Sequence, residues 1–373
     1  MLTLTAVSAL CSVAPGSLEA QGLLDRLRAP IATPVGVDVY WGVALASGPT
    51  IYNHGPAPAV TGARPELRAA FSPAGYATLH FTTPAVPIAG NLMARLDARA
   101  FASRRRYYGP SADPDRSASG IAIGYYHYEL APSLTARFLG GSAALQVGPL
   151  LRYTRLRAGG GYRHRTAGDA AVSAATLGLR SSGGTGKVGL HAEVSGVLGN
   201  RDPEAVAGLR VTVGGTTYAP VWDLDSPLTE LHAELGAFIR TPVPGHPTVH
   251  LRLGGGRLWG DAPVQERLYL GGSDVFRGAS EDRLAGTALL YGGAEVRIPV
   301  VTVSGLGQHA RFGVAGLLDG GWVRDTGTPS SGFVTAYGGG IWLRPTSAWS
   351  TFSAGLVHGP LGPRLYVRSD VGF

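Results

Sequence analysis

The chain has 373 residues, of which 15% are charged, and it contains 56 glycines and 26 prolines. Its mean hydropathy is +0.11, but no apolar run reaches about 18 residues, which argues against a transmembrane helix. Apolar residues instead alternate with polar ones, a pattern typical of a membrane β-barrel. A water-soluble β-rich protein could have the same composition. The length fits one domain, because single barrels often exceed the usual domain size.

The net charge is +7, and almost all of the basic residues are arginine; Lys187 is the only lysine. A basic chain can bind nucleic acid, but these arginines are scattered singly along the predicted strands. We therefore expect no nucleic-acid partner. The only cysteine is Cys11, which lies in the predicted signal peptide, so disulfides and cysteine-bound metals are excluded from the mature chain. We also expect no cofactor.

The N-terminus resembles an export signal. Residues 2–13 form a short apolar core, and residues 18–20 offer a cleavage site before Gln21. We predict a signal peptide over 1–20, a short lead-in over 21–34 and a barrel over 35–373. No basic residue precedes the apolar core, so an apolar N-terminal strand is the alternative.

From residue 35 onward, alternating segments are separated by clusters of Gly, Pro, Asp and Ser, which predicts about sixteen strands. They are expected near 35–46, 74–82, 91–102, 119–130, 133–141, 144–156, 171–180, 186–198, 205–218, 228–240, 247–258, 286–299, 310–322, 333–343, 349–357 and 364–373. The predicted fold class is all-β, a transmembrane antiparallel β-barrel. Each strand has one apolar and one polar face; in 186–198, Leu190 and Val194 oppose Lys187 and Glu193. In a barrel the apolar face meets lipid, whereas in a soluble sandwich it would face inward.

The lengths of the connections favour the barrel. The links 241–245, 300–309 and 344–348 are fairly short, whereas 259–285 and 323–332 are longer. Short periplasmic turns and long outer loops produce this asymmetry. The pattern fails at 157–170, a long link where a short turn is expected. This failure indicates a miscounted strand between 119 and 156.

Aromatic residues near the predicted strand ends point in the same direction, since barrels carry aromatic girdles at both membrane interfaces. They are Tyr40, Trp41, Tyr107, Tyr108, Trp259, Trp322, Trp342 and Trp349. The last strand ends in Phe373, and a terminal aromatic resembles the assembly signal of bacterial outer-membrane proteins. We therefore predict a location in the bacterial outer membrane.

The most specific motifs lie between 267 and 299. The run LGGSDVFRG at 270–278 is followed by GGAEVRIP at 292–299, and LLDGG follows at 317–321. These runs resemble the BamA/TamA surface-antigen superfamily, which has a Gly-Gly-Ser turn and an Arg-Gly motif on its sixth outer loop. The resemblance is specific over about 254–373. Two departures are that Phe276 precedes the arginine with Ala279 after the glycine, and that no periplasmic POTRA domain fits before the barrel.

The expected role of the loop 259–285 is structural. We predict that it folds back into the lumen, where Arg277 pairs with Asp319 and also with Glu295. A planar guanidinium suits a bidentate carboxylate contact, and Gly278 allows the backbone to approach the wall closely. Together with Phe276 and Arg297, these residues form the predicted lumenal lock; a solvated surface loop is the alternative.

The resemblance implies assembly or insertion of outer-membrane proteins, or protein translocation, at a weak seam between the first and last strands. The partners it implies are outer-membrane lipid, client outer-membrane or secreted proteins and, without POTRA domains, a separate periplasmic partner. A passive pore or solute channel is the first alternative. An outer-membrane lipid hydrolase or lumenal metal site is the second, because the pairs His191/Glu193 and His232/Glu234 each share one face of a strand. We expect no enzymatic activity, and the sequence contains no Gly-x-Ser-x-Gly nucleophile motif.

Overall fold

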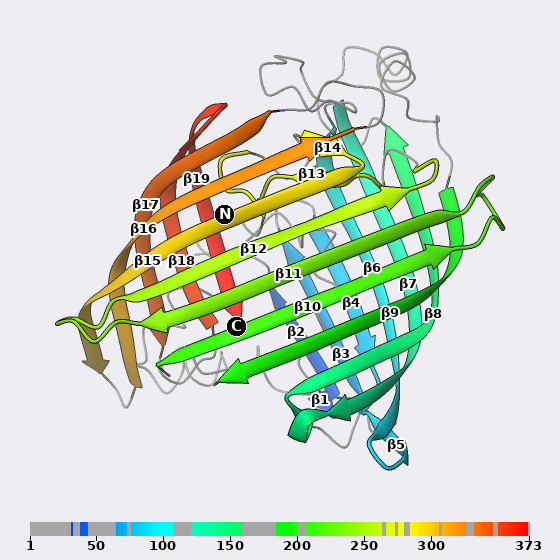
Figure 1. Cartoon of the computed structure of the whole chain (residues 1–373), viewed down its shortest axis with the longest axis horizontal. Coiled ribbons are helices and arrows are strands. Elements are labelled where there is room, and N and C mark those ends of the chain that lie inside the picture. The colour runs from blue at the N-terminus through cyan, green and yellow to red at the C-terminus, as the bar shows by residue number, and fades with distance from the viewer. Residues whose placement is uncertain are drawn as a thin grey trace.

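The computed structural model describes residues 31–32, 38–43, 65–72, 76–107, 121–158, 184–199, 206–262, 266–272, 275–279, 284–305, 308–325, 332–345 and 350–371. Nearly all of these residues lie in strands (Figure 1). Within the described part of the chain, no helix is long and apolar enough to span a membrane. The predicted signal peptide, the predicted strand 171–180 and Phe373 lie outside the described residues.

Within the described residues, seventeen strands form one sheet. They are β1 (Ile31–Ala32), β2 (Asp38–Val43), β3 (Glu66–Ser72), β4 (Tyr76–Thr82), β5 (Val86–Ala89), β6 (Leu92–Tyr107), β7 (Ile121–Phe138), β8 (Ala143–Ala158), β9 (Gly184–Gly199), β10 (Ala207–Tyr218), β11 (Leu228–Arg240), β12 (Thr248–Trp259), β15 (Ala288–Gly305), β16 (Gln308–Arg324), β17 (Phe333–Pro345), β18 (Ser350–Gly359) and β19 (Gly362–Val371). A second, two-stranded sheet consists of β13 (Leu268–Leu270) and β14 (Leu284–Gly286). The short 3-10 helix η1 (Leu139–Gly141) joins β7 to β8.

The sheet is a meander of antiparallel neighbours. From β3 to β19 each long strand pairs with the next, except that β12 pairs with β15 and thereby leaves β13 and β14 to the intervening loop. Figure 1 shows the sheet curled, with β9–β12 and β15–β17 crossing one side and β2–β8 the other. The predicted all-β antiparallel fold is confirmed, with one exception: β2 pairs in parallel with β3. No registered pair of the described residues joins β19 to β2, so the closing seam stays a prediction.

One predicted break in the sheet is wrong. The segments 119–130 and 133–141 form the single strand β7. Proline lacks a backbone N–H and usually ends a ladder, but here the register only skips around Pro132, from Leu130↔Leu151 to Leu134↔Val147. Gly148 makes this possible, because a Cβ there would lie 2.0 Å from the Pro132 carbonyl oxygen. The strand β3 was not predicted.

Merging the two segments restores the alternation of link lengths. At one end of the sheet, successive strands are joined by short links, which are 139–142, 200–206, 241–247, 306–307 and 346–349. At the other end the strands are joined by longer links, which are 108–120, 159–183, 219–227, 260–287 and 325–332. The tight turn at 360–361 is an exception at the long-link end. The predicted miscount between 119 and 156 is therefore confirmed, and the long link after β8 now falls at the end expected for outer loops.

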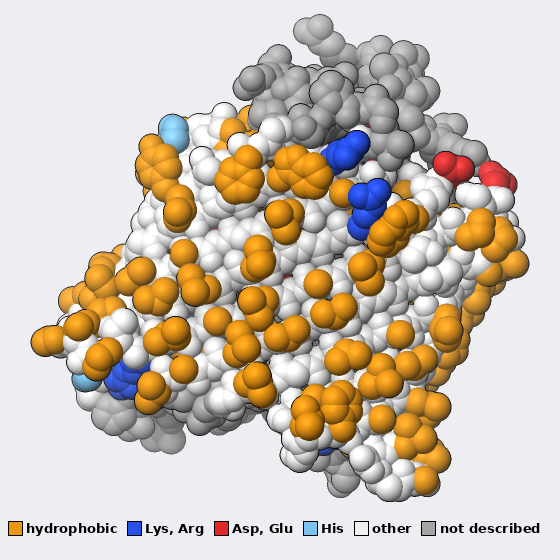
Figure 2. Space-filling model, viewed as in Figure 1, with side chains coloured by type: hydrophobic (Ala, Val, Ile, Leu, Met, Phe, Trp, Pro, Cys, Tyr) orange, Lys and Arg blue, Asp and Glu red, His pale blue; other side chains and the backbone are white. Residues whose placement is uncertain are grey.

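The two faces of the strands differ in the sense expected for a barrel. In β9, Leu190 is 59% exposed and Leu198 61%, whereas Lys187 is 0% exposed and Glu193 3%. The apolar face therefore points outward and the charged face inward, the reverse of a soluble sandwich. Figure 2 shows hydrophobic side chains spread over the outer face, with charged side chains toward its edges. Exposed apolar side chains spread over an outer face are typical of a surface that contacts lipid.

The aromatic girdle is only partly as predicted. Trp259 is 44% exposed at the end of β12, which fits an interface position. Trp342 is only 7% exposed, and its ring packs over Gly313, where a Cβ would lie 2.5 Å from it. Its indole Nε1 donates a hydrogen bond to the carbonyl oxygen of Val314 at 3.1 Å. The prediction is thus wrong for Trp342, because a glycine on the neighbouring strand leaves space for the ring.

Candidate functional site in the lumen

The loop between β12 and β15 lies inside the sheet. Leu268, Leu270, Phe276 and Leu284 of this loop have no exposed surface. They form one apolar cluster with wall residues Leu258, Leu289, Tyr291, Leu317, Val323, Val334, Ala336, Val357 and Tyr366. The hairpin of β13 and β14 and the turn that follows β13 are therefore packed against the strands β12 and β15–β19.

A tight turn orients the Arg-Gly motif. The Phe276 N–H donates to the Gly272 carbonyl at 3.1 Å, and the Gly272 N–H donates to the Ala279 carbonyl at 3.0 Å. Gly272 has a φ of 89°, a conformation that glycine adopts without steric cost. The turn inserts Phe276 into the apolar cluster. Phe276, which precedes the arginine in departure from the motif of the superfamily that the loop resembles, is therefore an apolar anchor beside Arg277.

Arg277 is bound by the two carboxylates that the sequence predicted. Its Nε donates to Asp319 Oδ2 at 2.8 Å and its NH2 donates to Asp319 Oδ1 at 2.7 Å. Its backbone N–H also donates to Asp319 Oδ2, at 3.0 Å. Its NH1 pairs with Glu295 Oε2, and Arg297 Nε binds the other oxygen of Glu295 at 2.6 Å. The guanidinium also lies 5.7 Å from the centre of the Tyr366 ring.

These charges are buried together. Arg277 is 4% exposed, Asp319 1% and Glu295 6%. Burial alone would lower the pKa of Arg277, but Asp319 and Glu295 raise it above its ordinary value, so the guanidinium stays protonated. The structure places Arg277 in contact with both carboxylates named from the sequence. That the contact acts as a lock stays a prediction.

Close backbone approach requires glycine at three positions around Arg277. A Cβ on Gly278 would lie 2.4 Å from Ala336 Cβ and 2.9 Å from the Phe276 ring. A Cβ on Gly359 would lie 2.4 Å from the Gly278 carbonyl oxygen. On the wall, Gly293 lies opposite Asp319, and a Cβ there would meet Asp319 Oδ1 at 2.4 Å. The missing side chains therefore allow the loop and the Asp319 carboxylate to reach each other.

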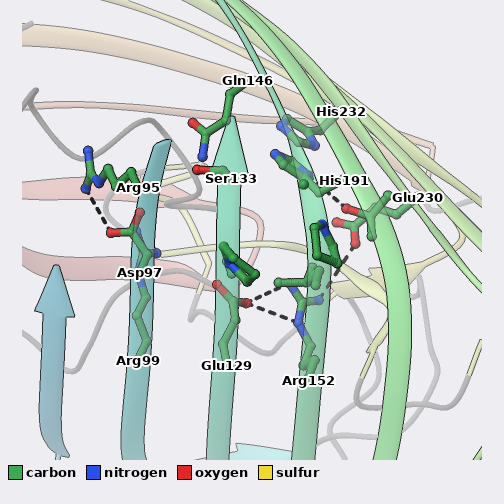
Figure 3. Close-up of a pocket in the computed structure, with 16 residues that line it drawn as sticks. Arg95, Asp97, Arg99, Glu129, Ser133, Gln146, Arg152, His191, Glu230 and His232 are labelled. Carbon is green, nitrogen blue, oxygen red and sulfur yellow. Dashed lines mark hydrogen bonds and ion pairs between the residues drawn. The ribbon is translucent and has the colours of Figure 1, made fainter. Parts of the chain in front are cut away.

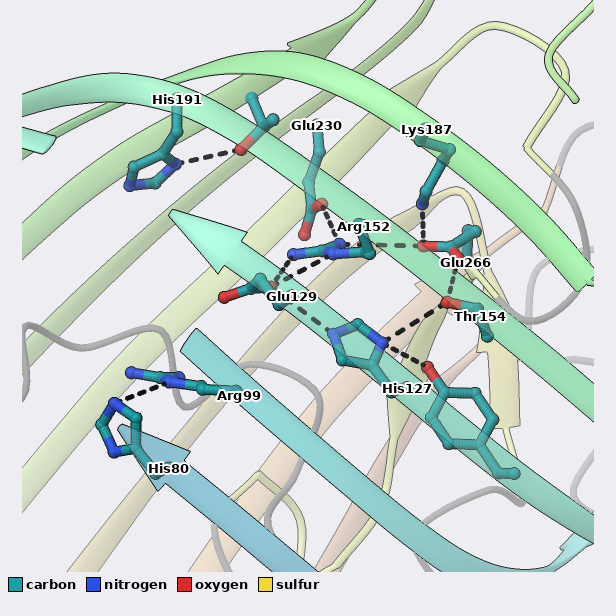
Figure 4. Close-up of polar contacts among 12 residues, drawn as sticks. His80, Arg99, His127, Glu129, Arg152, Thr154, Lys187, His191, Glu230 and Glu266 are labelled. Carbon is teal, nitrogen blue, oxygen red and sulfur yellow. Dashed lines mark hydrogen bonds and ion pairs between the residues drawn. The ribbon is translucent and has the colours of Figure 1, made fainter. Parts of the chain in front are cut away.

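A second ionic contact holds the other end of the loop, and the sequence did not predict it. Glu266 pairs with Lys187 of β9, and its Oε2 lies 3.8 Å from Arg152 NH1 of β8 (Figure 4). Thr154 donates to Glu266 Oε1 at 3.3 Å. Burial alone would raise the pKa of Glu266, but Lys187 and Arg152 lower it to about 2. The loop thus contacts two different walls of the sheet.

Further carboxylates surround Arg152. Glu129 accepts a hydrogen bond from its NH2 at 3.0 Å, and Glu230 Oε2 lies 4.0 Å from its NH1. Lys187 lies 4.5 Å from the centre of the Tyr218 ring. The signal available in the sequence was the single lysine, on the polar face of its strand. Nothing in the local pattern connects it to Glu266.

The two histidines of the His-x-Glu pairs, His191 and His232, line one polar pocket together with Glu230, whereas Glu193 and Glu234 do not line it (Figure 3). The imidazole rings stack with their centres 6.4 Å apart. His191 Nδ1 is 3.0 Å from Thr216 Oγ1, and His232 Nε2 is 3.5 Å from Glu193 Oε2. Within the described residues, no group of three His, Cys, Asp or Glu side chains could hold a metal ion.

Solved structures share this architecture. BamA from Haemophilus ducreyi lacking POTRA domains 1-3 matches with a TM-score of 0.53 and 14% identity, over 80% of this chain and 62% of that chain. The fold is that of a BamA barrel. CdiB from Escherichia coli and CdiB from Acinetobacter baumannii match with TM-scores of 0.53 and 0.50 and 13% identity, over 80% of this chain and 53% and 50% of theirs.

The resemblance to BamA predicted from the loop motifs is confirmed for the fold. The chain spans less than two thirds of the length of these BamA and CdiB chains. No family model matches the chain. A comparison with curated protein sequences also finds no match.

Proposed function

We propose that this chain is an outer-membrane β-barrel that assists the insertion of client proteins into the outer membrane or their translocation across it. The observation that carries the proposal is the in-folded loop, with Arg277 bound to Asp319 and Glu295 inside a barrel of the BamA fold. The motif resemblance associates this loop with insertion and translocation. The proposal assigns the chain no enzymatic activity.

The outward apolar face supports a membrane location. Leucine and valine side chains that are roughly half exposed lie along β9, β11, β12 and β15. Such a face is stable in contact with lipid acyl chains. Outer-membrane lipid is therefore the first partner in the proposal, and client outer-membrane or secreted proteins, delivered by a periplasmic partner, are the second.

A reconstitution experiment tests the proposal. The purified chain is placed in liposomes of outer-membrane lipid, and a urea-denatured eight-stranded barrel protein is added as client. We expect faster client insertion than in empty liposomes, measured by heat-modifiable migration and protease protection. Equal insertion rates with and without the chain would overturn the proposal. Ion conductance in planar bilayers without client insertion would favour the passive pore instead.

A further inference from the structure

The contact between Glu266 and the wall has the composition of an anion site. Glu266 Oε2 is bound by Lys187 and lies 3.8 Å from Arg152, and Glu266 Oε1 accepts a hydrogen bond from Thr154. Two cations and a hydroxyl on β8 and β9 therefore surround one carboxylate, as Figure 4 shows. Charge-assisted hydrogen bonds of this kind are the usual way in which proteins bind carboxylate or phosphate groups.

The charges around the carboxylate are not equivalent. Arg152 has Glu129 and Glu230 as additional partners. Lys187 has no exposed surface, and Glu266 is the only carboxylate within ion-pair distance of it among the described residues. Without Glu266, Lys187 would be a buried cation lacking a counterion, a costly state that is relieved by loss of the ammonium proton, by entry of water or by a replacement anion.

Glu266 is attached to this wall only through side chains in the described part of the chain. By contrast, β13, which begins at Leu268, is held by backbone pairing with β14 and by the apolar cluster. Arg267 pairs with Asp325 beyond the end of β16, on the opposite wall. The contacts that hold the hairpin and the Arg277 site are therefore distinct from those that hold Glu266.

We propose that Lys187, Arg152 and Thr154 form a lumenal binding site for an anionic group of the carboxylate or phosphate class, and that Glu266 fills this site as an internal ligand. When Glu266 moves away, the site opens and takes an external anion. This site is separate from the Arg277 contact, and the inference does not depend on client insertion.

The single lysine allows a direct test. The full chain, folded in detergent micelles, is treated with a small amine-reactive ester, and acylation of Lys187 is followed by mass spectrometry of its proteolytic peptide. In the wild-type protein we expect slow labelling, because Glu266 covers the amine. In Glu266→Gln we expect labelling about tenfold faster, since the reaction of a buried group follows the population of its open state. Inorganic phosphate should slow the labelling of Glu266→Gln more than chloride at equal ionic strength.

The matched control is Asp261→Asn, the same acid-to-amide change on the same loop. Asp261 is exposed, and its side chain only accepts a 3.5 Å hydrogen bond from Ser226. Lys187 in the Asp261→Asn variant should be labelled as slowly as in the wild-type protein. Heat-modifiable migration verifies that each variant is folded. If Glu266→Gln does not fold, Glu266→Asp replaces it, because this side chain keeps the charge but is shorter by one methylene, which weakens the contact with Lys187.

Faster labelling that phosphate suppresses supports the anion site. Two results would overturn it. One is labelling of the folded Glu266 variant at the wild-type rate. The other is fast labelling on which phosphate and chloride have the same effect, since the cations would then bind no anion in place of Glu266.

Discussion

The Arg277 site shows how one guanidinium can tie a loop to two strands. Asp319 on β16 accepts two hydrogen bonds from the guanidinium and one from the Arg277 backbone N–H, and Glu295 on β15 accepts the third guanidinium hydrogen bond. We expect Arg277→Ala to lower the stability of the folded barrel by about 3–5 kcal/mol, because the buried Asp319 loses its counterion and Glu295 keeps only Arg297. The measurement is the urea midpoint of the heat-modifiable form.

A charge swap tests whether the ion pair between Arg277 and Asp319 is itself responsible for this stability. Arg277→Asp combined with Asp319→Arg should recover part of the lost stability, but not all of it, because the new carboxylate on the loop would lie beside Glu295. Arg137→Ala at the exposed end of β7 is the control and should leave the midpoint unchanged. If all of these variants unfold at the same urea concentration, the loop is not a lock.

Gly278 permits a contact that any side chain would block. We expect Gly278→Ala to destabilise the barrel by about 1–3 kcal/mol, since overpacking costs this much and the new methyl group would meet Ala336 and Phe276. Adding Ala336→Gly removes one of the two clashes and should restore part of the stability. The same urea titration measures both variants. If Ala336→Gly restores none of the stability lost in Gly278→Ala, the clash with Ala336 is not the cause of that loss.

At the scale of the strand, position along the barrel wall decides what an outward charge costs. Val296 lies in the middle of β15 and is 39% exposed, whereas Val303 lies near the short turn and is 58% exposed. We expect Val296→Arg to cost about 2–4 kcal/mol and Val303→Arg about 0–1 kcal/mol in a lipid bilayer. Refolding into liposomes measures both. A larger cost at Val303 would contradict the assignment of this face to lipid.

Strands could be predicted where one sequence pattern is sufficient to define them. The segment 228–240 matches β11 residue for residue, because its alternation is clean and turn residues flank it. The strand β7 could not be predicted whole. Pro132 indicates a break, and the glycine that accommodates it, Gly148, is on the neighbouring strand. The sequence of this segment alone therefore cannot predict the whole strand, because the residue that accommodates the proline lies on another strand.

The same limit applies to the two loop contacts. Arg277, Glu295 and Asp319 were predictable because they fall in motifs that resemble a known superfamily. Glu266 falls in no motif, and its partner Lys187 lies about 80 residues earlier, on β9 near the middle of the chain. Whether two charges meet across a lumen depends on the curvature of the whole sheet, which alternation of residues does not encode.

At the scale of the whole molecule, the two loop contacts have a consequence for the order of assembly. The carboxylates that bind Arg277 lie on β15 and β16, after the loop in the chain, and the cations that bind Glu266 lie on β8 and β9, before it. The loop can reach its final position only when strands from both halves have arrived. Such sequence-distant contacts form late in folding. We therefore expect the loop to dock only after both sets of strands have formed. A chain truncated before β16 should lack the contact between Arg277 and Asp319, and its loop should stay undocked at that end.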